Sequence, residues 1–402
     1  MKKASKCAVA ILMFAVILFG MKNYMSLNGF IKPVIWQMIF GYSTNEVPED
    51  AGVNDKLLTV TSEIETMFVD NNHRYQYINL NGLFQNLIEK RYVSDIAANN
   101  DVIKLKNGYL TFLQKEYDIT QVAESTVEFN SFLSEKGIDF LYLQVPHKIS
   151  KYSPNLPYGL QDFSNSNTDR FLESVSLSGI KALDLREEIY NAGLNQYDFF
   201  FKTDHHWTPE GAFWAFRRVS EELKENYGFD IDEKTLDINN YSIRTLDDWF
   251  LGSQGKRTGK LYAGVDDFSI ITPNFETEFT VTTFTTDTST VKGDFEKTMI
   301  LTEHIQPRDY FNKNPYAVYT GGDFPLQIVT NHKSPNDKKI VLIRNSFACA
   351  FSPFLALNCQ ELHIIDLRHY KDGTTAQYIE KVNPDMIMIM YDGFSEKMFS
   401  FM

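Results

Sequence analysis

The chain has 402 residues, 43% of them hydrophobic and 14% aromatic, which is enough for one large folded domain or two ordinary ones. This composition excludes a disordered chain, because so many apolar side chains can form a buried core. The formal net charge of −13 argues against nucleic acid as a partner, since binding to phosphates requires clustered lysines and arginines.

The N-terminus has the layout of a signal peptide or a signal anchor. Three lysines within the first six residues precede the uncharged apolar run Cys7–Met21, and Lys22 follows it. The run is shorter than the roughly 20 residues of a spanning helix, but flanking lysines can snorkel and extend it. No small-x-small cleavage site follows, so we expect residues 1–25 to be an uncleaved anchor. The lysine bias places the N-terminus inside and the remaining chain outside the cell membrane; if the signal is cleaved, the protein is secreted.

Residues 26–118 read as an N-terminal extension with helical segments and no identifiable chemistry. Beyond them, short apolar runs that are typical of buried strands alternate with patterns that are typical of helices. The predicted strands are 140–145, 180–185, 340–343, 362–367 and 386–390, and the clearest helical patterns are 122–136 and 208–227. Such alternation predicts an α/β fold with a mostly parallel sheet.

The predicted strands fall into two blocks, at about 138–230 and 337–391. Between them, residues 275–284 alternate apolar and polar side chains, which is typical of a half-buried β-strand. We therefore expect one α/β domain in two parts, 119–235 and 331–402, interrupted by a β-rich insertion over 236–330.

The run Asp204-His205-His206-Trp207 is the strongest candidate for chemistry. It places a carboxylate and an imidazole two residues apart, just before a predicted helix that Thr208 can cap. An Asp and a His held in this way can be the orienting and base members of a nucleophilic triad. A solvated polar loop and a metal site are the alternatives. We expect no metal, because the predicted strands 140–145 and 340–343 are not followed by the further aspartates that a two-metal site needs.

Ser346 is the candidate nucleophile. It follows the predicted strand 338–343 through Arg344 and Asn345 and precedes a possible helix start. Open α/β folds build their sites at this carboxyl edge of the sheet. Backbone N–H groups at such a helix start point toward an incoming oxyanion. The alternative is a serine that only caps the helix.

The run TDHHWTPEGA at 203–212 resembles the signature of the DHHW protein family. That family is related to the SGNH-hydrolase-like domains of alginate O-acetylation proteins. Further similarity lies in 142–148, 319–323, 343–347 and 365–368, in a consistent order over most of residues 75–395. The resemblance implies an SGNH-hydrolase-like three-layer fold.

The resemblance also implies roles for individual residues. Asp204 orients His206, His206 is the base and Ser346 is the nucleophile, so that Asp and His precede Ser in the sequence. The family's serine block usually reads Asp-Ser-Phe, whereas here it reads Asn345-Ser346-Phe347. We expect this change to alter a rate or a pKa rather than to abolish the mechanism. The candidates for substrate or oxyanion contacts are Phe347, Arg344, Asn345, His205 and Lys148.

These features predict a membrane-anchored, extracytoplasmic O-acetyltransferase that modifies a cell-surface polysaccharide through an acyl-enzyme and without a cofactor. The relatives imply a membrane-embedded partner protein that passes acetyl groups outward, because acyl-CoA is cytoplasmic. One alternative is a carbohydrate esterase or deacetylase with the same triad. Another is a catalytically degenerate domain that binds polysaccharide or scaffolds an export complex.

Overall fold

The computed structural model describes residues 74–94 and 101–402. The predicted anchor over residues 1–25 lies outside these ranges. Among the helices of the described ranges, none combines the length and the apolar character needed to cross a membrane. The chain divides into two compact units, residues 1–93 with 257–263 and residues 94–256 with 264–402.

The described part of the first unit is small. It contains α3 (Arg74–Leu87), β1 (Tyr92–Val93) and α9 (Lys260–Ala263). The N–H of Lys260 donates to the side chain of Asn79 at 2.8 Å. A Cβ atom at Gly82 would lie 2.0 Å from the carbonyl oxygen of Thr258, so only glycine permits this close approach.

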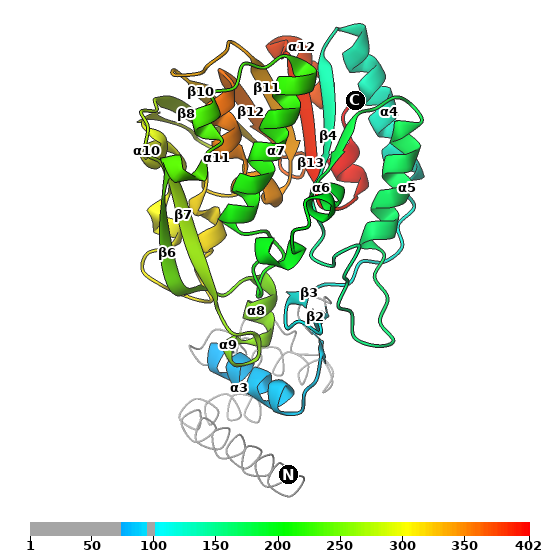
Figure 1. Cartoon of the computed structure of the whole chain (residues 1–402), viewed down its shortest axis with the longest axis vertical. Coiled ribbons are helices and arrows are strands. Elements are labelled where there is room, and N and C mark those ends of the chain that lie inside the picture. The colour runs from blue at the N-terminus through cyan, green and yellow to red at the C-terminus, as the bar shows by residue number, and fades with distance from the viewer. Residues whose placement is uncertain (1–73, 95–100) are drawn as a thin grey trace, which may run out of the picture. The chain divides into compact units, whose positions relative to one another are not determined.

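An eight-stranded sheet forms the centre of the second unit (Figure 1). In spatial order its strands are β5 (Ala182–Asp184), β4 (Asp139–Gln144), β13 (Met386–Tyr391), β11 (Lys339–Arg344), β12 (Glu361–Ile365), β10 (Leu326–Asn331), β8 (Phe279–Phe284) and β9 (Thr288–Gly293). Neighbouring strands from β5 to β12 are parallel, and β10, β8 and β9 continue the sheet in antiparallel pairs. The predicted α/β class is confirmed, but the sheet is mixed and its parallel character ends at β12.

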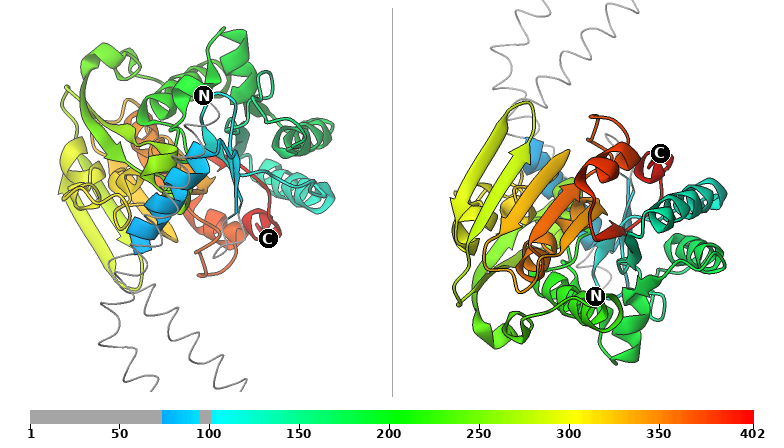
Figure 2. Two further views of the ribbon diagram at one scale, coloured as in Figure 1. Left: turned by 90° about the horizontal axis from the view of Figure 1, so that it is seen from below. Right: turned by 90° about the horizontal axis from the view of Figure 1, so that it is seen from above.

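Helices cover both faces of this sheet (Figure 2). Strand side chains alternate between the faces: Leu141 and Leu143 pack with α7 (Pro209–Tyr227) and α11 (Ser352–Leu355). Phe140 and Tyr142 instead belong to a core with three other helices. These helices are α4 (Thr120–Glu135), α5 (Ser164–Ser176) and α12 (Thr375–Val382). Both faces are therefore buried, as the near-continuous apolar runs of the central strands require.

The segment 236–330 has two structural roles. Its first strands, β6 (Tyr241–Phe250) and β7 (Asp266–Pro273), form a separate antiparallel ribbon. Its later strands β8, β9 and β10 extend the main sheet beyond β12. The remaining short elements of the second unit are β2 (Val102–Lys104), β3 (Leu110–Thr111), α6 (Leu185–Asn191), α10 (Phe295–Met299) and the 3₁₀ turns at 196–199, 233–235, 238–240, 302–304, 315–318, 346–349, 356–358 and 396–399; α8 (Ser253–Thr258) begins in this unit.

The start of α7 matters most for the site. Thr208 caps this helix by accepting a hydrogen bond from the N–H of Gly211 at 3.2 Å, and Pro209 occupies its first turn. Gly228 ends the helix in the left-handed conformation, with φ of 67°. The sequence signals therefore place the helix start directly after the Asp204–Trp207 run.

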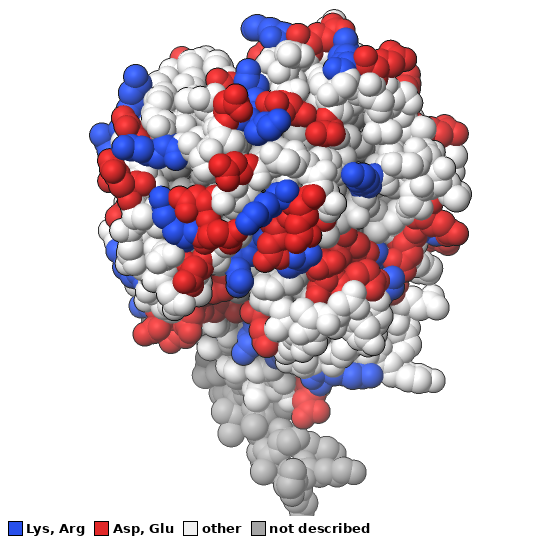
Figure 3. Space-filling view, turned by 45° about the horizontal axis from the view of Figure 1, so that its top comes forward, with Lys and Arg blue, Asp and Glu red and all other residues white. Residues whose placement is uncertain are grey.

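On the face shown in Figure 3, acidic and basic side chains are interspersed in small groups.

Candidate active site

Ser346 lies at the carboxyl end of β11, where the chain turns into a 3₁₀ helix over Ser346–Cys349. Its neighbours Asn345 and Phe347 are buried, whereas Ser346 itself is partly exposed. The fold thus presents the hydroxyl at the edge of the sheet where parallel strands end.

His206 lies between Asp204 and Ser346. Its Nε2 is 2.8 Å from Oγ of Ser346, and its Nδ1 is 2.5 Å from Oδ1 of Asp204. The ionised carboxylate can only accept, so Nδ1 carries the proton and Nε2 is left to accept from the serine hydroxyl. This arrangement has the geometry of a nucleophile, a base and the group that orients the base.

Asp204 is a buried carboxylate whose hydrogen bonds are satisfied. Burial would raise the pKa of Asp204, but the adjacent His205 and His206 and two donated hydrogen bonds together hold this pKa well below its usual range. Oδ2 accepts from the N–H of Ser253 at 2.5 Å, and Oδ1 also accepts from the N–H of His206 at 3.0 Å. The residue is therefore ionised at neutral pH, as an orienting carboxylate must be.

The backbone of the Asp204 run is fixed from several sides. Asp266 accepts from the N–H groups of Lys202 and Thr203, both at 2.8 Å, and from the Thr203 hydroxyl at 2.6 Å. Gly252 packs directly on Asp204, where a Cβ atom would lie 2.2 Å from that of Asp204. The run is thus an ordered loop rather than a solvated one.

Trp207 connects the histidine loop to the serine loop. It is buried, and its Nε1 donates to the carbonyl oxygen of Phe347 at 3.0 Å. Tyr316 donates to the same oxygen at 2.9 Å, and its ring stacks on His206 with 4.0 Å between ring centroids. Two aromatic residues therefore set the distance between His206 and Ser346.

Lys148, which follows β4 in the chain, holds the same loop by hydrogen bonds. Its ammonium group donates to the carbonyl oxygens of Lys202, at 3.0 Å, and of Asp204. Burial lowers the pKa of Lys148 to about 7, against the opposing effect of the carboxylates of Asp266 and Asp204. Lys148 thus binds the loop backbone and also lines the hollow described below, and its contact with substrate stays a prediction.

Replacing Lys148 by methionine should change how stability depends on pH. Between about pH 7 and pH 10, the lysine is protonated in the unfolded chain but largely neutral in the folded one, so raising the pH stabilises the wild type. The variant lacks this group. We expect the wild type to gain free energy of unfolding relative to Lys148→Met as the pH rises through this window. Urea unfolding near pH 7 and near pH 9.5 measures the free energy of unfolding of both proteins. If the wild type does not gain free energy relative to the variant between these two pH values, the lowered pKa of Lys148 is contradicted.

The predicted oxyanion donors are only partly available. The N–H of Phe347 donates to Oδ1 of Asn345 at 3.2 Å, so it is already engaged. The N–H of Ser346 has no acceptor among the described residues. Arg344 is buried and donates to Asp323 and, at 2.8 Å, to the carbonyl oxygen of Gly322. These contacts argue against the expected help from Arg344 at the oxyanion.

His205 lies beside the hydrogen-bonded chain rather than in it. Its Nδ1 is 2.9 Å from Oγ of Ser253, and its ring centroid is 3.8 Å from that of His206. It also lines a hollow of about 140 Å³, whose wall includes Phe347 but none of Asp204, His206 and Ser346. His205 therefore lies in the wall of this hollow, and its contact with substrate stays a prediction.

The structure adds residues that the sequence did not single out. Asn345 donates through its side chain to Asp392, which directly follows β13, a neighbour of β11 in the sheet. The strand-end rule that located Ser346 would also have located Asp392. Ser253 and Tyr316 come from the 236–330 segment and carry no sequence signal that relates them to the site.

Two groups in the described chain offer ligand atoms close enough together for a metal ion. The first is Asp204 with His205 and His206, but in it Asp204 is hydrogen-bonded to His206, and His206 is hydrogen-bonded to Ser346. The second is formed by Asp323, Asp366 and His369. Its carboxylates pair with arginines, including Arg368 at 2.9 and 2.6 Å. In both groups, carboxylate oxygens are therefore already paired within the protein.

Comparisons with known proteins agree with this fold. A family model described as an SGNH hydrolase-like domain of the acetyltransferase AlgX matches residues 106–243, a range that includes Asp204 and His206 but not Ser346. No curated protein matches the sequence. The resemblance to DHHW and alginate-acetylation proteins is confirmed by this match and by the solved structures below.

Three solved structures share the fold. Bacillus cereus PatB1 is 22% identical, with 76% of this chain and 100% of that chain covered and a TM-score of 0.62. A PatB1 structure with a sulfonyl adduct gives 21% identity, coverage of 75% and 99%, and the same TM-score. A DHHW family protein from Eubacterium siraeum is 19% identical, with coverage of 75% and 94% and a TM-score of 0.55.

Proposed function

We propose that this protein is an O-acetyltransferase that moves an acetyl group from an ester donor to a hydroxyl group of a cell-surface polysaccharide. The observation that carries the proposal is the unbroken hydrogen-bonded chain from Asp204 through His206 to Ser346. The match to a model of an acetyltransferase domain supports the reaction class.

In the first half-reaction, Oγ of Ser346 attacks the carbonyl carbon of the donor ester while Nε2 of His206 takes the hydroxyl proton. Asp204 stabilises the imidazolium that forms. The tetrahedral intermediate collapses by breaking the bond to the donor oxygen, which receives the proton from His206. The products are the free donor alcohol and an acetyl ester on Ser346.

In the second half-reaction, a sugar hydroxyl attacks the acetyl-serine carbonyl and gives its proton to His206. Collapse breaks the bond to Oγ of Ser346, which regains the proton, and releases the acetylated sugar. The N–H of Ser346 is the backbone donor available for the oxyanion in both steps. If water attacks instead, the same residues perform hydrolysis.

The acetyl donor and the location belong to the same proposal. The lysine-flanked apolar run Cys7–Met21 supports a membrane anchor that holds residues beyond it outside the cytoplasm. A membrane-embedded partner would then supply acetyl groups on that side, and the polysaccharide would be the acceptor.

The test is a two-stage assay on the full-length protein. An activated acetyl ester, p-nitrophenyl acetate, is added first, and release of p-nitrophenolate is followed with and without soluble oligosaccharides. Acetylated sugar identifies a transferase, whereas acetate alone in the presence of acceptor identifies an esterase. Release at the uncatalysed rate would overturn the enzyme proposal and leave a polysaccharide-binding or scaffold role.

A further inference from the structure

We propose that the hollow beside Ser346 is the subsite for the acceptor, that it takes a polyhydroxylated alcohol, and that Asp392 is the residue that binds it. The inference rests on the proposed function, because an acceptor acts only on an acyl-enzyme. The hollow measures about 140 Å³. Its wall includes His205, Phe347 and two carboxylates, Asp162 and Asp392.

The hollow lies beside the loops that carry His206 and Ser346, although neither of these two residues lines it. His205 and Phe347 in its wall are the chain neighbours of His206 and Ser346. Asp392 reaches it from the carboxyl end of β13 and accepts a hydrogen bond from Asn345, the residue before Ser346. A ligand in this hollow therefore lies next to an acetyl group carried by Ser346.

The wall of the hollow combines apolar and polar side chains. Only Phe112, Ile149 and Phe347 among the lining residues are apolar, and the others carry hydroxyl, amide, imidazole, ammonium or carboxyl groups. Several of these polar groups already have partners within the protein: His147 lies 2.8 Å from the Thr168 hydroxyl, and Lys148 donates to backbone carbonyl oxygens. A hollow of this size holds several water molecules, so it admits a hydroxymethyl group or one edge of a sugar ring.

Asp392 is the open acceptor in this wall. One oxygen of its carboxylate accepts from Asn345, and the other receives no hydrogen bond from the described residues. The second carboxylate, that of Asp162, is fully engaged: it accepts from the N–H of Gln114 at 2.7 Å and from the N–H of Ser164 at 3.0 Å. The free oxygen of Asp392 is thus the site for a hydroxyl donated by a ligand.

An acceptor with two neighbouring hydroxyl groups can bind through one of them and react through the other. One hydroxyl donates to Asp392 and holds the molecule in the hollow, while the next one points toward His206 and the acetylated serine. A simple alcohol of the same length has only the hydroxyl that reacts. The acyl-enzyme should therefore prefer glycerol to 1-propanol as acceptor.

A competition between glycerol and 1-propanol tests this. The full-length wild type, Asp392→Ala and Asp392→Asn are each given p-nitrophenyl acetate with both alcohols at equal concentration, and the two acetate esters are quantified. We expect the wild type to favour glycerol and both variants to lower the glycerol-to-propanol ratio by about tenfold, the effect of losing one hydrogen bond to a charged group. The ratio counts only molecules that form the acyl-enzyme, so partial unfolding of a variant does not affect it.

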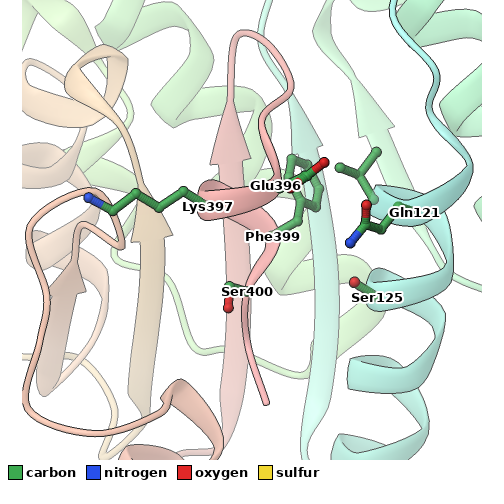
Figure 4. A pocket seen from close by; sticks show the side chains of 7 residues that line it. Gln121, Ser125, Glu396, Lys397, Phe399 and Ser400 are labelled. Atoms are coloured by element: carbon green, nitrogen blue, oxygen red, sulfur yellow. The ribbon is translucent and has the colours of Figure 1, made fainter.

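A matched control is Glu396→Gln. Glu396 lies four residues further on in the same terminal segment but lines a different hollow, next to α4 (Figure 4). This variant should keep the wild-type ratio. If the wild type shows no preference for glycerol, the proposed acceptor site is wrong, although the acyl-enzyme can still form. The proposal is also wrong if Asp392→Asn prefers glycerol as strongly as the wild type does. Absence of any acyl-enzyme would instead refute the proposed function, and the inference with it.

Discussion

Replacing Ser346 by alanine is expected to lower kcat for p-nitrophenyl acetate by at least about 10⁴-fold, because the variant lacks the hydroxyl that carries the acetyl ester. The loss should appear in kcat rather than in KM, since the hydroxyl is removed without changing the walls of the site. Steady-state kinetics of the full-length protein measure both constants.

The control for this variant is Ser400→Ala, an exposed serine away from the chain of Asp204 and His206. It should keep the wild-type kcat, and both variants should keep the wild-type unfolding midpoint. A Ser346→Ala protein that remains folded and retains activity would remove Ser346 from the mechanism.

Replacing Asp204 by asparagine is expected to cost about 10⁴-fold in kcat. The amide preserves the shape of the side chain, but its NH₂ group can donate to Nδ1 of His206 and so favour the tautomer with a proton on Nε2. That tautomer cannot accept the proton of Ser346, whose hydroxyl lies 2.8 Å away. The change therefore removes the base without removing the histidine.

A double variant separates this explanation from a general loss of structure. If Asp204 acts only through His206 and Ser346, then Asp204→Asn combined with Ser346→Ala should be no slower than Ser346→Ala alone. Asp372→Asn, a change at an exposed carboxylate, is the control and should leave kcat unchanged. A further large loss in the double variant would show that Asp204 has another role.

Much of the architecture could be predicted because the local signals are strong. The apolar runs at 340–343 and 386–390 lie in β11 and β13, and the helical pattern at 208–227 lies in α7. Thr208 and Pro209 mark the start of α7 to within one residue because capping is a local interaction. The end of a predicted strand points to Ser346, and the start of a predicted helix points to His206, although the two residues are 140 positions apart in the sequence.

Other features depend on contacts that no local pattern records. Alternation over 275–284 indicates a strand but does not identify its partner, so the antiparallel pairing of β8 with β10 within the main sheet could not be foreseen. Arg344 was placed correctly at a strand end, yet its pairing with Asp323 depends on a loop 21 residues earlier. Tyr316 contributes to the site for the same non-local reason.

The structural role of Asn345 follows from its hydrogen-bond partners. In the sequence it stands where the DHHW family, which this chain resembles, usually has an aspartate. In the structure its side chain accepts from the N–H of Phe347 and donates to Asp392, so a carboxylate still lies one hydrogen bond away from position 345. This contact accounts for how an amide can stand beside the nucleophile.

The most direct test of the central claim is the mass of the protein after brief exposure to an activated acetyl ester. An acetyl-enzyme on Ser346 predicts a gain of about 42 Da, located by peptide mapping to the fragment that contains Ser346 and absent from Ser346→Ala. An unmodified wild type, or the same adduct on Ser346→Ala, would contradict the proposed triad.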